Sequence, residues 1–346
     1  MATENIKLMG MGNPLLDISS EVPQEILDKY DVKLNNAILA EEKHLPLYQE
    51  LVASYSPQYI AGGATQNSIR VAQWMLSGTE PKSTAFMGCV GKDEFGAQLE
   101  KCASEEDGVL VHYMKDDDAP TGTCAVLVKD GERSLIANLA AANNFKPSHL
   151  ETQLAKDIYN AASVYYIAGF FLTVSVESLK IIADHAVEKN KTFCLNLSAP
   201  FIIDFFADQV ATAMPYTDFV FANESEAETY AKKHDLGSDL KEVALKVAAM
   251  PKTNSNRPRT VVFTQGSEST IVACDGQVYE FAVDPLEKEK LVDTNGAGDA
   301  FVGGFLSVLI QDQYEIEAAV KAGHWAAREI IQRSGCTFPK DCAYKA

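Results

Sequence analysis

The stretch Asp293-Thr294-Asn295-Gly296-Ala297-Gly298-Asp299 immediately precedes an apolar run, 300–310, that has a helical pattern. Gly296 and Gly298 let the backbone turn tightly and expose N–H groups at the start of that helix, where they stabilise an anion. The carboxylate of Asp299 would lie in the same place and act as a general base toward a hydroxyl in phosphoryl transfer. The plainer interpretation is a glycine-rich turn with Asp299 as an ordinary N-cap, and both interpretations fit the stretch taken alone.

Short apolar runs alternate with longer amphipathic ones along most of the chain. The runs that we expect to be buried strands are 6–11, 165–171, 192–197, 218–222 and 260–264. Helical periodicity is found in 176–189, 240–250 and 316–331. This alternation predicts an α/β fold with an open parallel sheet, helices on both faces, and ligands at the carboxyl ends of the strands.

Two regions interrupt the alternation and predict hairpins. The extended runs 121–128 and 133–138 are joined by Lys129-Asp130-Gly131-Glu132, and we expect them to belong to a small β appendage. A second pair, 270–273 and 277–283, is joined around Asp275-Gly276. The polar segment 252–259 contains a proline and is expected to be a surface loop.

The chain has 346 residues and a formal net charge of −18. This charge argues against nucleic acid and against an anionic membrane surface as partners, because both require basic patches. A chain of this charge that binds ATP has to supply positive potential at the site itself, from backbone amides, an Arg or Lys, and a metal ion. Remote carboxylates matter little, since salt screens charges beyond about 8 Å.

Seven scattered cysteines, without a C-x-x-C pair, are typical of free thiols in a reducing cytosol rather than of disulfides or a zinc site. The start of the chain lacks a basic segment followed by an apolar one, and no apolar run approaches the roughly 18 residues of a membrane span. We therefore expect a cytoplasmic protein that makes no membrane contact.

Three motifs in order resemble the ribokinase, or phosphofructokinase-B type, carbohydrate kinase superfamily. The stretch 293–301, followed by Gly303-Gly304, is similar to its C-terminal signature. Gly62-Gly63-Ala64-Thr65-Gln66-Asn67 resembles its Gly-Gly-x-x-x-Asn element, and Asn223-Glu224-Ser225-Glu226 resembles its Asn-x-x-Glu motif near magnesium and phosphate. The resemblance implies a ribokinase-like fold of three layers, α/β/α, around a mostly parallel sheet, with a small β-rich lid.

Further segments narrow the resemblance to the branch of the superfamily that phosphorylates adenosine; they are 12–17, 66–68, Arg133 with 137–143, and 196–201. The resemblance runs essentially end to end. It implies transfer of a phosphoryl group from ATP to the ribose 5′-hydroxyl of adenosine, with Asp299 as general base. The amides of Gly296, Ala297 and Gly298 would form the anion hole, Mg²⁺ would bind with ATP, and the protein would be a monomer.

The resemblance places the acceptor site mostly in the N-terminal half. Asp17 would accept hydrogen bonds from the ribose hydroxyls, and the other residues around the sugar would be Asn13, Gly62, Gly63, Asn67 and Asn196. Phe170 would stack on adenine with Phe201 nearby. The pocket wall would include Leu15, Ile38, Cys124, Leu135 and Ala137. The plainer alternatives are a turn residue for Asp17 and ordinary core packing for the apolar residues.

Residues that would hold ATP come mostly from the C-terminal half; they are Asn223, Thr264, Gly266, Asn295, His324, Ala327 and Ile331. The guanidinium of Arg133 would hold the transferring phosphoryl group bidentately, or it is simply a solvated hairpin charge. Glu226 would hold magnesium through water, because magnesium keeps several waters. The alternative for Asn223 and Glu226 is an N-cap followed by an exposed Glu, and for His324 a packed or surface residue.

The lid would consist of about 15–38 and 117–137, and the large domain of about 1–14, 39–116 and 138–346. We expect the lid to close over the site and exclude water. A close alternative is another sugar or nucleoside kinase of the same superfamily. An alternative of a different class is a non-catalytic nucleoside-binding protein, which the retention of Gly296, Gly298 and Asp299 argues against.

Overall fold

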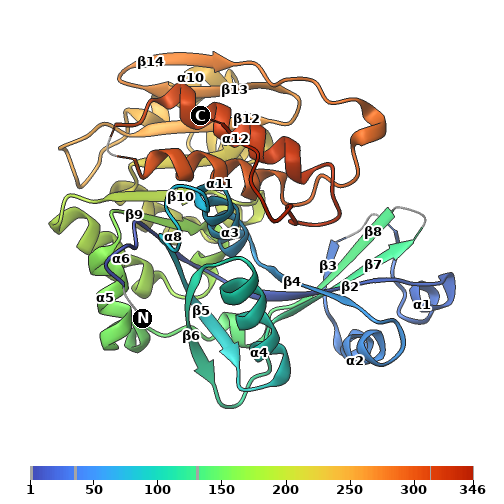
Figure 1. Ribbon diagram of the computed structural model, residues 1–346. Coiled ribbons are helices and arrows are strands. Elements are labelled where there is room, and N and C mark those ends of the chain that lie inside the picture. Colours follow the sequence, from blue (N-terminus) through green and yellow to red (C-terminus); the bar gives the residue numbers. More distant parts are fainter. Residues whose placement is uncertain (1–2, 35–36, 130–131, 312, 346) are drawn as a thin grey trace.

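The computed structural model describes residues 3–34, 37–129, 132–311 and 313–345. Within them, the larger sheet has nine strands in the order β14-β13-β12-β11-β10-β9-β1-β5-β6 (Figure 1). In that order they are β14 (Gln277–Phe281), β13 (Glu268–Cys274), β12 (Thr260–Gln265), β11 (Phe219–Asn223), β10 (Thr192–Asn196), β9 (Val164–Ala168), β1 (Leu8–Met11), β5 (Thr84–Gly91) and β6 (Leu110–Asp116). The strands from β12 to β6 pair in parallel, whereas β13 and β14 are antiparallel.

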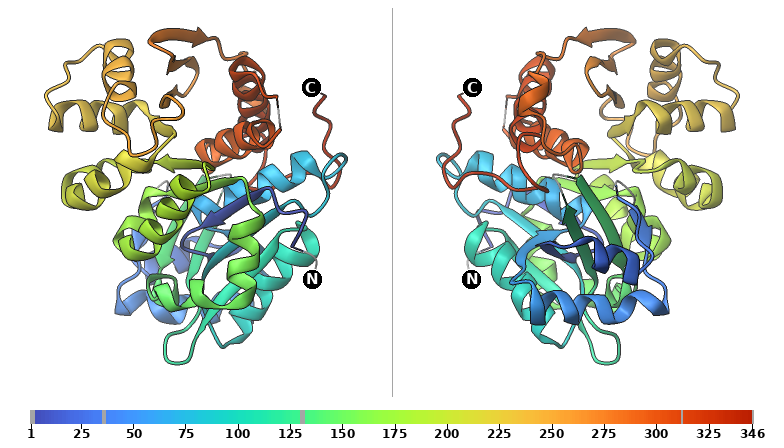
Figure 2. Two further views of the ribbon diagram at one scale, coloured as in Figure 1. Left: turned by 90° about the vertical axis from the view of Figure 1, so that its left-hand side faces the viewer. Right: turned by 90° about the vertical axis from the view of Figure 1, so that its right-hand side faces the viewer.

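Alternate side chains of the central strands enter two separate cores, which explains why the strands are apolar throughout. Leu8, Phe86 and Tyr166 belong to one core and Met9, Met87 and Tyr165 to the other. The first core is covered by α3 (Ala64–Leu76), α4 (Glu94–Lys101), α11 (Ala297–Leu309) and α12 (Ile316–Ile330). The second is covered by α5 (Gln153–Ala161), α6 (Val176–Glu188), α7 (Pro200–Phe205), α8 (Ala207–Ala213), α9 (Glu224–Lys233) and α10 (Leu240–Ala248). Figure 2 shows these helices on opposite sides of the strands, so the predicted three-layer fold is confirmed.

A second sheet projects from the first, at the right of Figure 1. Its order is β3-β8-β7-β2-β4, formed by β3 (Ala37–Leu39), β8 (Glu132–Asn138), β7 (Thr123–Lys129), β2 (Leu15–Glu21) and β4 (Gln58–Gly62). Two helices, α1 (Gln24–Lys29) and α2 (Leu45–Ser54), contribute buried residues to the core beneath it. The smaller β-rich part is therefore present as predicted.

The boundary predicted near residue 38 does not follow the second sheet. Residues 39–116 were expected to belong to the large domain, yet β4 pairs with β2 over its whole length, and α2 packs against the same sheet. The partner of a strand is fixed by contacts far away in sequence, which a local pattern does not reveal. The division into two domains stays a prediction, with β4 and α2 moved to the smaller part.

Most predicted elements are confirmed within one or two residues. The strand expected at 165–171 ends at Ala168, because 169–173 form a 3₁₀ turn that leads into α6. Both hairpins are present as β7–β8 and β13–β14; Asp130 and Gly131 of the first turn lie outside the described residues. In the second turn Asp275 and Gly276 have φ of 49° and 74°, the left-handed pair that an Asp-Gly hairpin turn requires.

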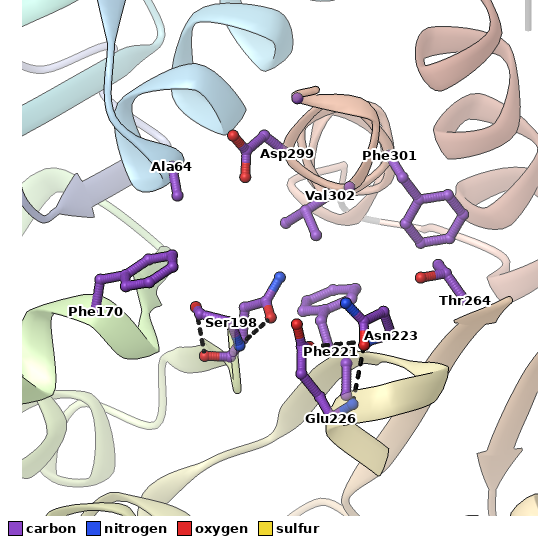
Figure 3. Close-up of a pocket in the computed structure, with 14 residues that line it drawn as sticks. Ala64, Phe170, Ser198, Phe221, Asn223, Glu226, Thr264, Asp299, Phe301 and Val302 are labelled. Atoms are coloured by element: carbon purple, nitrogen blue, oxygen red, sulfur yellow. Dashed lines mark hydrogen bonds between the residues drawn. The ribbon is translucent and has the colours of Figure 1, made fainter. Parts of the chain in front are cut away.

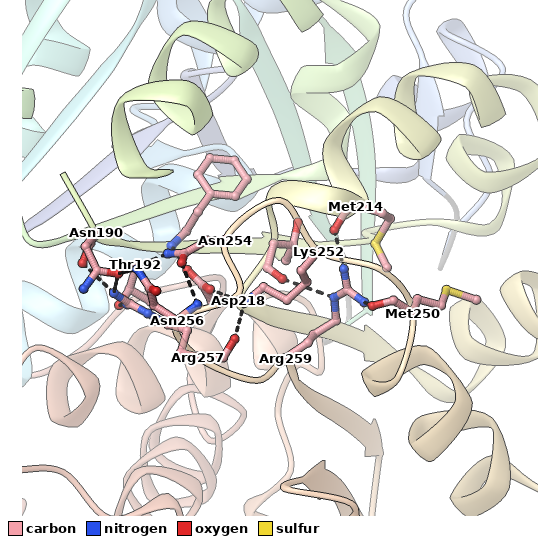
Figure 4. A network of polar contacts seen from close by, with 12 residues as sticks. Asn190, Thr192, Met214, Asp218, Met250, Lys252, Asn254, Asn256, Arg257 and Arg259 are labelled. Carbon is pink, nitrogen blue, oxygen red and sulfur yellow. Dashed lines mark hydrogen bonds and ion pairs between the residues drawn. The ribbon is translucent and has the colours of Figure 1, made fainter. Parts of the chain in front are cut away.

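The segment 252–259 is more than the surface loop that its composition predicts. It crosses the amino ends of β10, β11 and β12, where Lys252 forms a buried ion pair with Asp218 (Figure 4). Arg259 is 1% exposed. Its guanidinium donates to five carbonyls around the ends of neighbouring turns and helices, those of Met214, Thr217, Val247, Met250 and Pro251. This network fastens the edge of the sheet that lies opposite the carboxyl ends of its strands.

No helix among the described residues has both the length and the apolar composition to cross a membrane.

We expect Arg259→Leu to lower the free energy of unfolding by about 3 kcal/mol, because it leaves several buried carbonyls without a donor. Urea unfolding followed by circular dichroism measures this loss. As a control, Lys241→Gln removes an exposed ion pair with Glu280 and should leave the midpoint unchanged. A midpoint of Arg259→Leu equal to that of the control would contradict the structural role of this network.

Candidate active site

The first turn of α11 faces a pocket formed at the carboxyl ends of the parallel strands (Figure 3). Gly296 is the N-cap of α11, with a left-handed φ of 79°, and Ala300 N–H donates to its carbonyl at 2.8 Å. Asp299 is the third residue of the helix, so the interpretation of Asp299 as an N-cap is wrong. The left-handed φ favours glycine at position 296, and a Cβ there would also make a tight contact, 3.2 Å, with Cβ of Cys336.

The anion hole differs from the expected one at Ala297. Its N–H donates to the carbonyl of Thr294 at 3.2 Å, which closes the turn before the helix. No backbone hydrogen bond from the N–H of Gly298 or Asp299 is found within the described part of the chain. Amides in the first turn of a helix have no intrahelical acceptor, and the helix dipole adds to their positive potential. Gly298 and Asp299 therefore offer the N–H groups, and Ala297 would first have to release Thr294.

Asp299 is half-buried, and Asn67 is its hydrogen-bond partner among the described side chains. Its Oδ2 accepts from Nδ2 of Asn67 on α3 at 3.0 Å. Burial raises the pKa of Asp299 to about 7, the nearby charge of Glu226 raises the pKa further, and the hydrogen bond from Asn67 opposes both. A carboxyl group with such a pKa exchanges a proton near neutral pH, as a general base requires.

The pocket brings together residues from distant motifs. Among the predicted site residues, its lining includes Phe170, Asn196, Asn223, Glu226, Thr264, Gly296, Gly298 and Asp299. Figure 3 shows Asp299, Glu226 and Phe170 around the same open space. Sequence reasoning missed the lining residues Ala64, Ser198, Phe221, Ala222, Phe301 and Val302. Each of these lies within three residues of a predicted site residue, so closeness in the chain was the available signal.

Asp293 organises the loop before α11. Its Oδ1 accepts from the N–H and the side-chain amide of Asn295, both at 2.9 Å. Its Oδ2 accepts from Gly335 N–H at 3.0 Å and from Nη1 of Arg133 at 2.9 Å. The backbone N–H groups of Val292 and Asp293 donate to the carbonyl of Ile331. The loop is thus held by β8 through Arg133, by the C-terminal segment through Gly335, and by the end of α12 through Ile331.

Arg133 lies on β8 and is 9% exposed, so the alternative of a solvated hairpin charge is wrong. Its Nη1 is engaged with Asp293, which ties the smaller sheet to the loop before α11. Its Nη2 is buried, and no hydrogen-bond partner for it is found among the described residues. A buried cationic donor without an acceptor is a candidate for holding an oxyanion.

Asn223 and Glu226 form a capping box at the start of α9. Asn223 Oδ1 accepts from Glu226 N–H, and Glu226 Oε2 accepts from Asn223 N–H, each at 2.9 Å. The N-cap alternative is therefore right for Asn223, but Glu226 is 4% exposed and lines the pocket instead of facing solvent. Burial raises the pKa of Glu226 to about 7.

The donor set fits magnesium only as an ion held largely by water and ligand oxygens. No group of three or more His, Cys, Asp or Glu side chains suited to a metal ion occurs in the described ranges. A single carboxylate at the pocket wall is a common protein contribution to a magnesium ion that carries phosphates. Glu226 meets that description.

Asp17 and the glycine pair lie beside the pocket, at the start of the smaller sheet. A side chain at Gly62 would come within 2.5 Å of Asp17 Oδ1, and one at Gly63 within 2.1 Å of the carbonyl of Asn13, so both positions need glycine. Asn13 Nδ2 donates to the carbonyl of Ala142 at 3.3 Å, and its buried Oδ1 has no partner within the described ranges. Burial raises the pKa of Asp17 to about 7, while Arg70 and Arg133 lower it.

The residues predicted for the apolar wall lie on one face of the smaller sheet together with Asp17, except for Ile38. Asp17, Cys124 and Ala137 are direct neighbours across β2, β7 and β8. Leu15 lies two residues before Asp17, and Leu135 two residues before Ala137, so both are on the same face. On β3, however, Leu39 pairs with Ala137, whereas Ile38 pairs with Ile136 and packs against the core. Successive side chains of a strand point to opposite faces, so Leu39, 67% exposed, and not Ile38 lies on the face of Asp17.

The two phenylalanines proposed for adenine are neighbours, with ring centroids 6.1 Å apart. Phe170 lines the pocket, and Phe201, 45% exposed, lies outside its lining. Ser198 holds the loop beneath them: its Oγ accepts from Gly169 N–H at 2.8 Å, and its φ is 67°. Its N–H donates to Asn196 Oδ1 at 2.8 Å, which fixes the Asn196 side chain at the pocket edge.

Five of the residues predicted for the nucleotide lie along or next to β12 and α12, whereas Asn223 ends β11 and Asn295 lies in the loop before α11. Thr264 lines the pocket, and Gly266 has a φ of 58° in the open turn before β13. His324 Nε2 lies 2.8 Å from Thr270 Oγ1, and its ring packs 5.5 Å from that of Phe301, a lining residue. Burial lowers the pKa of His324. His324 is therefore a packed residue one layer behind the pocket. Ala327 packs against the core, and Ile331 acts through its carbonyl on the loop before α11.

The chain matches the family model described as pfkB family carbohydrate kinase over residues 25–342. It is 55% identical over 334 residues to adenosine kinase 2 of Arabidopsis thaliana, covering 96% of each chain.

Two solved structures extend the comparison. A crystal structure of Anopheles gambiae adenosine kinase in complex with P1,P4-di(adenosine-5) tetraphosphate is 49% identical, with a TM-score of 0.86 over 97% of this chain and 98% of that one. An apo structure of adenosine kinase from Trypanosoma brucei brucei is 34% identical, with a TM-score of 0.91 over 95% of this chain and 99% of that one.

We expect Gly296→Ala to lower the free energy of unfolding by about 1–2 kcal/mol, because alanine resists the left-handed conformation. Gly298→Ala is the matched control two residues away: a side chain there meets no atom within 4 Å, and the position is helical. Thermal unfolding of both variants measures the difference. Equal melting temperatures would contradict the conformational role assigned to Gly296.

We expect Asp299→Asn to stabilise the fold at neutral pH. Because the folded-state pKa of Asp299 is raised from 3.8 to about 7, its stabilising contribution is complete below the unfolded pKa and is lost as pH rises through about 7. The melting temperature of the variant should therefore exceed that of the wild type most above pH 7, and the excess should shrink toward pH 4. Asp204→Asn, at an exposed position of α7, is the control that should show no such trend. A pH-independent difference for Asp299→Asn would rule out the raised pKa.

Proposed function

Because the chain belongs to the pfkB family of carbohydrate kinases, we propose that it is an adenosine kinase that transfers the γ-phosphoryl group of ATP to the ribose 5′-hydroxyl. The observation that carries this proposal is Asp299, a carboxyl group with a pKa near 7 set beside free backbone N–H groups at a pocket. The end-to-end similarity to enzymes named adenosine kinase supports the acceptor.

In the proposed reaction Asp299 accepts the proton of the 5′-hydroxyl as the oxygen attacks the γ-phosphorus. A bond forms between that oxygen and phosphorus, the bond from phosphorus to the bridging oxygen of ADP breaks, and AMP and ADP leave. The N–H groups of Gly298 and its neighbours stabilise charge on the transferred group. The hydrogen bond from Asn67 keeps enough of Asp299 ionised to accept the proton near neutral pH.

Arg133 would supply the positive charge that the acidic chain needs at the phosphates. Its unpartnered Nη2 supports this role, and its Nη1 already bonds to Asp293 at the base of the same turn. When bound, Mg²⁺ would neutralise phosphate charge, with Glu226 holding it through water. Asn223, Thr264, Gly266 and Asn295 would contact the nucleotide, with His324, Ala327 and Ile331 supporting its wall from behind.

The acceptor would lie between Asp17 and Phe170. Asp17, Asn13 and Asn67 would take the ribose hydroxyls, with the Gly62-Gly63 backbone against the sugar and Asn196 at its edge. The apolar face of the smaller sheet, with Leu39 in place of Ile38, would cover the base as a lid; its other members are Leu15, Cys124, Leu135 and Ala137. Closure would exclude water from the phosphoryl group.

Purine salvage, a cytoplasmic location and a monomeric state complete the proposal. Seven free cysteines support a reducing compartment, and the net charge of −18 argues against nucleic acid as a partner. The near alternative, another sugar or nucleoside kinase of the family, does not explain why Phe170 lines the pocket with Phe201 packed beside it. A non-catalytic nucleoside-binding protein lacks a reason for the raised pKa of Asp299.

A panel of adenosine, guanosine, inosine, ribose and fructose tests the acceptor, with ADP formation as the readout. We expect adenosine to have the highest kcat/KM, because Phe170 and the apolar lid favour a purine nucleoside over a free sugar. Preference for ribose or fructose would contradict the proposal and favour the sugar-kinase alternative.

We expect Asp299→Asn to lower kcat by about 10²–10⁴-fold while adenosine still binds, since the amide keeps the shape but does not accept the proton. Isothermal titration with adenosine and steady-state kinetics measure the two quantities separately. Undiminished turnover in a correctly folded variant would remove Asp299 as the general base.

A further inference from the structure

Arg70 is a buried cation near the site and belongs to none of the sequence motifs described above. It lies on α3, and its side chain is 4% exposed. Its Nε donates to Asp107 Oδ2 at 2.5 Å, and its Nη1 donates to the carbonyls of Ala61 and Cys336 at 2.5 and 3.2 Å. The same Nη1 donates to Oδ1 of Asn67 at 3.2 Å. A fixed guanidinium therefore lies against the oxygen of the Asn67 amide.

This contact decides which end of the amide faces Asp299. The two ends of an Asn amide have nearly the same shape but opposite hydrogen-bonding character. Since Arg70 has only donors, the oxygen of Asn67 turns toward it, and Nδ2 is left to donate to Asp299 Oδ2 at 3.0 Å. A flipped amide would set two donors together at Arg70 and two acceptors together at Asp299.

We propose that Arg70 is a positioning residue for the general base: it locks the Asn67 amide so that an N–H group always faces the Asp299 carboxylate. This inference rests on the proposed kinase function and deepens it. Among the described residues Arg70 has no hydrogen bond to Asp299 or to the pocket lining, so its link to Asp299 passes through Asn67; its charge also lowers the pKa of Asp17. The spacing i, i+3 on α3 places Arg70 and Asn67 on one side of the helix.

The other ionisable groups around Asp299 do not replace the Asn67 contact. The charge of Glu226, from α9, raises the pKa of Asp299. Asp299 is also close enough to influence three groups from other elements, namely Asp17 on β2, Tyr166 on β9 and Cys336 in the C-terminal segment. All three are neutral or negative, and both arginines of the region already have carboxylate partners. Loss of the Asn67 hydrogen bond therefore raises the pKa of Asp299.

The test compares Arg70→Met with Arg70→Lys. We expect Arg70→Met to lower kcat for AMP formation by about tenfold or more and to move the acidic limb of the kcat–pH profile to higher pH. The direction follows because ionised Asp299 is the active form and its pKa rises. The KM for ATP should change little. Arg70→Lys keeps a cationic donor and should recover most of kcat and the position of the limb.

Two further variants separate positioning from folding. Arg70→Met leaves Asp107 unpaired, so the double variant Arg70→Met/Asp107→Asn removes both charges and keeps the fold testable. Gln73→Met is the matched control: Gln73 is also buried on α3, and its Oε1 accepts from Ser83 and Thr84. We expect Gln73→Met to lower the melting temperature without moving the acidic limb. A folded double variant with an unmoved limb, or an equal shift in Gln73→Met, would overturn the proposal.

A carbon-13 NMR titration of the Asp299 carboxyl group, identified by its absence in Asp299→Asn, measures the same displacement without turnover. A wild-type protein that makes no AMP from adenosine would overturn the proposed function. An Asp299 titration that Arg70→Met leaves in place would overturn the positioning role. The two failures are thus told apart in one set of variants.

Discussion

The first turn of α11 holds a carboxylate and unpaired backbone N–H groups side by side, and much of the surrounding structure serves that arrangement. Gly296 takes the left-handed conformation that starts the helix, and Asp293 fastens the preceding loop to Arg133 and Gly335. The positive end of the helix attracts an anion, while Asp299 remains available as a base because burial keeps its pKa high. An acidic chain thus has positive potential at the pocket, from backbone N–H groups and the nearby Arg133.

The sequence was sufficient for the parts of the fold that local patterns determine. Continuous apolar runs predicted the buried parallel strands, and Gly296, Gly298 and Asp299 predicted the start of α11 within a few residues. Glu226 and Thr264 were predicted at the nucleotide side and line the same pocket as Asp299. Residues at or just after the end of a parallel strand lie at the carboxyl edge of the sheet, which explains why the motifs meet at one pocket.

Other features depend on partners that are remote in sequence. Whether Ile38 or Leu39 faces the site depends on the register between β3 and β8, and a shift of one residue exchanges the two faces. β4 joins the smaller sheet because it pairs with β2, and no pattern in residues 58–62 predicts this partner. The sequence predicts nothing for Arg70 beyond a place on a helix; its importance follows from its hydrogen bonds to Asn67 and Cys336. The local conformation of a motif can be predicted from its own sequence, whereas the contacts between motifs become known only from the structure.

Three carboxyl groups, the buried Glu226 and the half-buried Asp17 and Asp299, have a pKa raised to about 7 by desolvation, and such groups cluster at functional sites. The central claim is that Asp299 is the group whose ionisation permits phosphoryl transfer. The dependence of kcat on pH with adenosine and saturating ATP tests it most directly. The account predicts a rise in kcat with an apparent pKa near 7 on the acidic side. A kcat that stays constant from about pH 5 to 8 would contradict it.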